Sequence, residues 1–163
     1  MTTPTIIERP VQIYAGIPAE LRLGELAKTI DAKFPALFAW LGERRVEPRG
    51  APFIRYHRID MAKTLDVEFG LPVARDIEPA GEVRAGTLPA GRFAVLIHEG
   101  PYDGLRAANA ALLDWATQAR IDLDVTATPT GDRFACRLET YLTDPRKEPN
   151  PAKWQTEVAI KLR

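Results

Sequence analysis

The order in which apolar periodicity changes along the chain is the feature that most constrains its fold. In residues 5–17 apolar side chains alternate with others, as on a strand with one covered face, and Pro18 closes that segment. Residues 23–41 show the 3.6-residue spacing of a helix instead. Residues 53–60 and 65–73 alternate again and predict a hairpin. The first half therefore predicts a strand, a helix and two strands.

The second half repeats this order. The four repeating segments are residues 83–99, 105–119, 134–143 and 156–162. We interpret residues 1–163 as one domain of two pseudo-repeats, about 5–76 and 82–163. The expected fold is α+β, in which duplicated strand-helix-strand-strand units form one curved, mostly antiparallel sheet with two helices on one face. The other face of the sheet is then expected to form a groove.

Two local signals refine the predicted helices. Pro35 lies inside the first apolar stripe, where a missing backbone donor predicts a kink or a break near Lys33. Asp103 precedes the second stripe and is expected to cap its helix.

Charge and cysteine content exclude several classes of protein. The 22 basic and 22 acidic residues divide equally at Gly81, so no basic arm is present and we expect no direct nucleic-acid partner. Without a basic leader or a run of eighteen apolar residues, the chain is expected to be cytoplasmic and not to enter a membrane. The lone Cys136 forms no internal disulfide, and His57 and His98 lie in different halves, so no cofactor or metal is expected.

Alternation also predicts which side chains line the groove. If Phe134, Cys136 and Leu138 lie beneath the helices, their polar neighbours point to the open face, and the same reasoning applies to the hairpin at 53–73. The side chains expected there are Arg137, Glu139, Tyr141, Asp66, Glu68 and Tyr56. Cys136 is then a buried thiol on the helix side. Trp40 and Trp115 are expected in the core, and Trp154 at the rim of the pocket.

A carboxylate flanked by aromatic rings suits a flat or lipophilic cation, because the rings attract its charge and the carboxylate pairs with it. Burial would strengthen Glu139 as a base, whereas the neighbouring Arg137 would weaken it. The alternative is that Glu139 pairs with Arg137, or with an arginine on an adjacent strand, on a solvated face.

Four segments also carry a family resemblance: residues 14–16 (YAG), 100–105 (GPYDGL), 138–145 (LETYLTDP) and 151–160 (PAKWQTEVAI). In this order they resemble the GyrI-like small-molecule-binding domains. These domains are related to the effector-binding domains of AraC-type and MerR-type multidrug regulators, within the SOUL/SHS2-duplication superfamily. The resemblance runs from about residue 6 to residue 162.

The resemblance implies a tandem strand-helix-strand-strand fold whose concave sheet holds a drug-like ligand, with an acidic pocket residue at the position of Glu139. In the regulators a DNA-binding module precedes this domain, whereas here the domain starts within ten residues of Met1, so we expect a stand-alone binder. Some stand-alone members are hydrolases that open strained cyclopropane rings. By that resemblance, Glu139 would position or deprotonate water while Tyr141, Tyr56 or a tryptophan holds the substrate.

Three hypotheses follow. The first is a binder of small lipophilic molecules, cations included, whose ligand contacts are Glu139, Tyr141, Tyr56, Glu68, Arg137 and Trp154. The second is a hydrolase of strained cyclopropane rings with Glu139 and Tyr141 as catalytic residues. The third is a protein-interaction partner that modulates gyrase, suggested by the name of the family.

Overall fold

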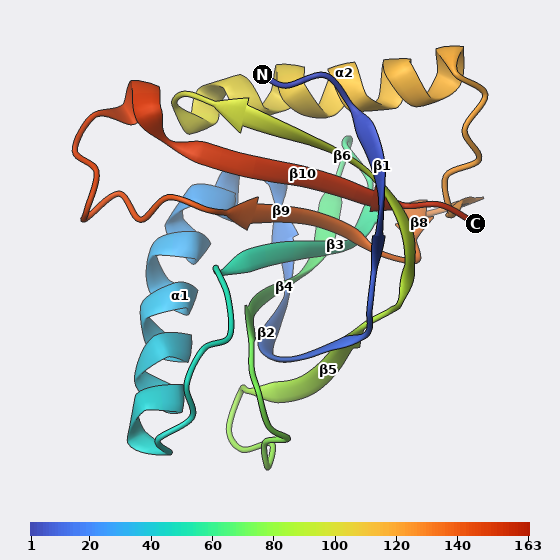
Figure 1. Cartoon of the computed structure of the whole chain (residues 1–163). Coiled ribbons are helices and arrows are strands. Elements are labelled where there is room, and N and C mark those ends of the chain that lie inside the picture. The colour runs from blue at the N-terminus through green and yellow to red at the C-terminus, as the bar shows by residue number, and fades with distance from the viewer.

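The computed structural model describes residues 1–163 as one ten-stranded sheet with two α-helices (Figure 1). The strands are β1 Thr5–Arg9, β2 Gln12–Arg22, β3 Phe53–Ile59, β4 Thr64–Pro72, β5 Arg84–Leu88, β6 Gly91–Glu99, β7 Val125–Thr128, β8 Gly131–Phe134, β9 Arg137–Tyr141 and β10 Gln155–Lys161. The helices are α1 Leu26–Glu43 and α2 Leu105–Gln118, with the short 3-10 turns η1 Leu23–Glu25, η2 Tyr102–Gly104 and η3 Pro151–Lys153.

The sheet joins two halves of the same internal order. Its strands run β1-β6-β10-β9-β3-β4-β2-β5, with the β7–β8 hairpin attached to β3. In each half the strand before the helix pairs with the last strand, and the strand that precedes this last strand, β3 or β9, lies innermost. The two innermost strands, β3 and β9, pair antiparallel with Ile54 opposite Glu139. The predicted α+β fold, a curved antiparallel sheet with both helices on one face, is confirmed (Figure 1).

The halves exchange their edge strands, which the sequence did not predict. Residues 5–17 are not one strand: the chain breaks at Pro10, so that β1 pairs with β6 of the other half. Residues 83–99 break in the same way near Pro89, and β5 pairs with β2. Proline has no N–H to donate to a ladder, which explains both breaks. Pro18 does not end β2, because β5 pairs with β2 only as far as Gly16 and leaves an open edge beyond it.

Two details predicted for the helices need correction, the break in α1 and the cap of α2. α1 runs from Leu26 to Glu43 without a break at Pro35. α2 is capped by Gly104, not by the side chain of Asp103, which lies in η2. A Cβ on Gly104 would lie 2.5 Å from the His98 ring, so a side chain at this turn would collide with it. Neither α1 nor α2 combines the length and apolar character that spanning a membrane requires.

The sheet is buried on both faces. Beneath the helices, the core consists of two clusters under α1 and one under α2. The opposite face buries a cluster of its own, made of Tyr14, Phe53, Phe93, Val95, Cys136, Leu138 and Ala159. We call this the inner cluster, since the sheet curls around it. The face expected to be open is therefore filled over much of its area.

Glycines make room for the rings of the inner cluster. A Cβ on Gly86 would lie 2.3 Å from the Tyr14 ring, and one on Gly70 would lie 2.4 Å from the Phe53 ring. Both distances are far below van der Waals contact, so a methyl group at either position forces a buried ring to move.

We predict that Gly86→Ala lowers the free energy of unfolding by about 1 to 3 kcal/mol, as overpacked cores do. Gly42→Ala in α1 is the matched control, because a Cβ there meets nothing within 4 Å. Urea unfolding of both variants measures the difference. Equal urea midpoints for Gly86→Ala and the wild type would show that the packing of the Tyr14 ring does not require the space left by Gly86.

Candidate functional site

Glu139 lies on the helix side of the sheet, opposite to the prediction. It pairs with Ile54 of β3 and Val158 of β10, and both of these belong to clusters beneath the helices. Cys136 and Leu138 face the inner cluster instead. The prediction was wrong because Phe134 ends β8 and packs beneath α2, whereas Cys136 lies past a break in the strand. Alternation does not carry across that break.

The Glu139 carboxylate is buried and is held only by neutral donors. Glu139 is 9% exposed to solvent. Oε1 accepts hydrogen bonds from the hydroxyl groups of Tyr56, at 2.8 Å, and Tyr141, at 3.0 Å. Oε2 accepts one from Nδ2 of Asn109 in α2, at 3.0 Å. None of the ion pairs in the structure includes Glu139.

The two tyrosines remain neutral donors over a wide pH range. Burial raises the pKa of Tyr56 well above its ordinary value, and the charge of Glu139 and its hydrogen bond raise it further. The pKa of Tyr141 is raised in the same direction, first by burial and then by the charges of Glu139 and Tyr56. Neither hydroxyl can serve as a base near neutral pH, and both stabilise the carboxylate.

Arg137 reaches Glu139 only through Asn109. Its Nη2 donates to Oδ1 of Asn109 at 3.0 Å, and the guanidinium lies 4.7 Å from the centre of the Phe134 ring. Burial lowers the pKa of Arg137, and the charges of Glu139 and Asp132 act against that shift. The structure therefore contradicts the alternative in which an exposed Glu139 pairs directly with Arg137.

Aromatic rings form a continuous array beside the carboxylate. Centroid distances are 4.8 Å for Trp154 and Tyr102, 5.6 Å for Tyr102 and Tyr141, and 6.0 Å for Tyr141 and Phe34. Phe34 in turn packs edge-on against Phe69. This array of Trp154, Tyr102, Tyr141 and Phe34 leads from the loop before β10 to α1. Tyr102 is its exposed member, at 38%.

Glu68, which was expected beside Glu139, lies across the sheet from it. Its Oε1 accepts from the hydroxyl group of Tyr14 at 2.7 Å and contacts Nε2 of His57. Burial raises the pKa of Glu68, but the hydrogen bonds from His57 and Tyr14 and the nearby Arg55 outweigh it, and the pKa lies below its ordinary value. With Asp66, it lines an open cleft of about 560 Å³ on that face. The predicted grouping of Glu68 with Glu139 is wrong.

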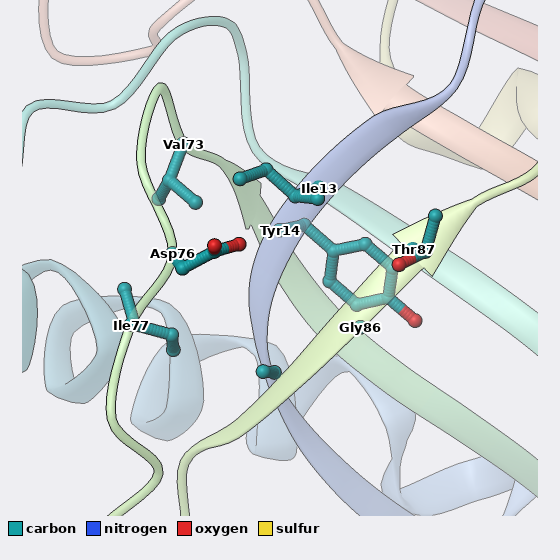
Figure 2. A pocket seen from close by; sticks show the side chains of 8 residues that line it. Ile13, Tyr14, Val73, Asp76, Ile77, Gly86 and Thr87 are labelled. Carbon is teal, nitrogen blue, oxygen red and sulfur yellow. The ribbon is translucent and has the colours of Figure 1, made fainter.

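A second hollow lies at the β5 edge of the sheet and is too small for a drug-like ligand. It holds about 120 Å³ and is lined by residues of β2, β5 and the segment after β4. Figure 2 shows Asp76 beside Ile13 and Val73, with Tyr14 against the strand at Gly86. Pockets for such ligands usually occupy about 300 to 1,000 Å³. The cleft at Glu68 falls within this range and the hollow does not. Beside Glu139, the rings of the aromatic array contact one another.

Of the side chains proposed from the sequence, Glu139, Tyr141 and Tyr56 meet directly. Trp154 joins them through Tyr102, and Arg137 through Asn109. Sequence reasoning missed Asn109, Tyr102 and Phe34. Asn109 had a usable signal, because it stands four residues after Leu105 on the buried stripe of α2, where a polar side chain needs a partner.

Cys136 is buried, as predicted, but it lies in the inner cluster and not beneath the helices. Burial raises the pKa of its thiol to about 11, which leaves little thiolate near neutral pH.

Comparison with known proteins identifies one family and several solved structures that share the fold. The model of a family described as GyrI-like small molecule binding domain matches residues 2–163. A search of curated proteins finds no match. The chain superposes on EcmrR in a complex with DNA with a TM-score of 0.81 at 21% identity, covering 99% of this chain and 57% of that one. The chain thus spans little more than half of EcmrR.

Other solved structures share the fold over nearly their whole length. The isolated C-terminal domain of EcmrR gives a TM-score of 0.78 at 21% identity, covering 99% of this chain and 97% of that one. SAV2435 bound to tetraphenylphosphonium gives 0.64 at 9%, with coverages of 99% and 94%. A hydrolase from Listeria innocua gives 0.61 at 15%, with coverages of 98% and 91%. At these identities the likeness establishes the fold alone.

We predict that Tyr56 and Tyr141 do not ionise before the native protein unfolds in alkali. In the unfolded chain their phenols ionise near pH 10, whereas in the folded chain their pKa values are higher, so the free energy of unfolding falls as pH rises through 10. Absorbance at 295 nm, followed together with circular dichroism, measures this order of events. Glu139→Gln removes the negative charge beside both hydroxyl groups, so Tyr56 and Tyr141 should ionise at a lower pH in this variant. Ionisation of all four tyrosines near pH 10 in a folded protein would contradict the geometry of the site.

Proposed function

The chain belongs to the family of GyrI-like small molecule binding domains, and from that premise we propose that it binds lipophilic cations between α1 and α2, with Glu139 as their counter-charge. The observation that carries the proposal is the buried Glu139 carboxylate, which accepts three hydrogen bonds, all from neutral groups.

A cation suits this carboxylate better than a neutral molecule does. Taking a carboxylate out of water is costly, and hydrogen bonds from neutral groups compensate only part of that cost. A cation that lies close to Glu139 recovers Coulomb energy that is strong because water is excluded. The rings of Tyr141, Tyr102 and Trp154 add attraction through their faces.

The ligand reaches Glu139 along the aromatic array. Tyr102 is partly exposed, and Trp154 is tied to the loop before η3 by a hydrogen bond from its Nε1 to the backbone oxygen of Glu148, at 2.8 Å. We propose that these two rings move apart and stack on the ligand, so that ring-to-ligand contacts replace ring-to-ring contacts. Tyr56 and Tyr141 keep the carboxylate oriented. The binding of tetraphenylphosphonium by SAV2435 supports the choice of that cation as a probe.

Isothermal titration calorimetry with tetraphenylphosphonium tests the proposal. Glu139→Gln preserves the shape of the side chain and removes its charge, so the affinity should fall by about tenfold or more. Glu68→Gln is the matched control, because it removes a carboxylate from the opposite face and should leave the affinity unchanged. Equal affinities of the wild type and Glu139→Gln, with circular dichroism showing both folded, would refute the role of Glu139.

One feature of Glu139 also favours a second function, the hydrolysis of strained cyclopropane rings. Its Oε2 accepts a single hydrogen bond, from Asn109, and so retains a lone pair for a water molecule. In this reaction Glu139 takes a proton from water while the water oxygen bonds to a ring carbon. The ring C–C bond breaks, and its electron pair passes to a conjugated carbonyl oxygen, which is then protonated.

Incubation with a cyclopropane-containing alkylating agent in ¹⁸O-labelled water tests this reaction. Mass spectrometry should find one labelled oxygen in the ring-opened product, at a rate that Glu139→Gln reduces by about a hundredfold or more. Tyr141→Phe should reduce it less, because Tyr56 still donates to the same oxygen. A rate no higher than that of buffer alone over several such compounds would leave binding as the function.

A further inference from the structure

Arg137 places a largely unused guanidinium beside Glu139. Of the five N–H donors that a guanidinium carries, one makes a hydrogen bond, from Nη2 to Oδ1 of Asn109. Nε is buried without a partner. One face of the group is covered by the Phe134 ring. Buried donors are normally satisfied, so the missing acceptor requires an explanation.

Asn109 keeps the two opposite charges apart. Its Nδ2 donates to Oε2 of Glu139 and to the backbone oxygen of Leu105, and its Oδ1 accepts from Arg137. The reverse orientation of the amide would set its oxygen against the carboxylate and its NH₂ group against the guanidinium. Pairs of arginine and carboxylate in proteins are frequently direct and bidentate. Here a single amide, with a hydrogen bond of 3.0 Å on each side, separates them.

From this arrangement we infer that the site takes cations that also carry a carboxylate or another hydrogen-bond acceptor a few bonds from the positive centre. Glu139 holds the cationic centre, and Arg137 binds the acceptor with its unused donors. The inference rests on the proposed function and specifies the class of ligand.

The spacing of the two charges selects among such ligands. A molecule with adjacent charges cannot span Asn109, whereas one with a chain of several bonds between them reaches both groups. Arginine suits the acceptor end because its planar fork fits a carboxylate bidentately. A cation without an acceptor still binds at Glu139 but leaves the guanidinium unsatisfied.

Two phosphonium probes test the inference by calorimetry at the same salt concentration. (4-Carboxybutyl)triphenylphosphonium carries a carboxylate on a chain of four methylenes, and pentyltriphenylphosphonium has a similar chain without one. We expect the wild type to bind the carboxylate probe about tenfold tighter, since hydrogen bonds to charged groups contribute at that level. In Arg137→Gln the ratio of the two affinities should fall to about one. Arg137→Lys keeps the charge without the fork and should retain part of the ratio.

The outcomes separate the inference from the function on which it rests. If the pentyl probe binds through Glu139 but the wild type shows no preference for the carboxylate, or Arg137→Gln keeps the preference, the inference is overturned and the proposed function stands. If neither probe binds the wild type, both are overturned. The comparison within the wild type needs no substitution, so a variant that fails to fold does not prevent a decision.

Discussion

The antiparallel pairing of β3 with β9 is the interaction on which the rest of the structure depends. It joins the two halves into one sheet and places Ile54 opposite Glu139. In this register Tyr56, two residues along β3 from Ile54, reaches the same carboxylate oxygen as Tyr141 of β9. Since side chains alternate between faces, a slip of one residue would turn Glu139 toward the inner cluster. The position of the carboxylate between the helices thus follows from the register of β3 with β9.

Both faces of the sheet are buried over much of their area. On the face away from the helices, Tyr14 and Phe53 pack over glycines, and an open cleft lies beside Glu68. The small hollow of Figure 2 lies at the β5 edge, where Val73 and Ile77 from the helix side come close to Tyr14. On the helix face, two of the clusters are mostly aliphatic, and the third, which contains Tyr56 and Phe69, lies beside the pairing of β3 with β9. There a buried carboxylate and an array of rings take the place of aliphatic packing. Rings in contact with one another can exchange those contacts for a flat ligand at little cost in buried area.

The sequence predicts the fold correctly but assigns Glu139 and its neighbours to the wrong face of the sheet. Periodicity located both helices and the order of the main strands, because each helix buries one stripe. Alternation failed at β9 because it assumes one buried face, whereas here Leu138 and Glu139 are both buried, on opposite faces. The break between β8 and β9 concealed the change, since Phe134 and Cys136 look in phase but pack in different clusters. The exchange of β1 and β5 rests on contacts between distant segments, which local patterns do not record.

Three side chains that the sequence grouped together do meet, because the chemistry of a residue and the face of the sheet it occupies are separate inferences. Glu139, Tyr56 and Tyr141 contact one another, although all three lie on the helix face and not on the face predicted for them. Glu68 does lie on the predicted face, and for that reason it is separated from Glu139 by the sheet.

A crystal structure with tetraphenylarsonium is the most direct test of the proposed site, since anomalous scattering locates the arsenic. We expect the arsenic between α1 and α2, beside Glu139, with Tyr102 and Trp154 moved apart. Arsenic in the cleft at Glu68, with the Glu139 site unchanged, would contradict the proposed binding site.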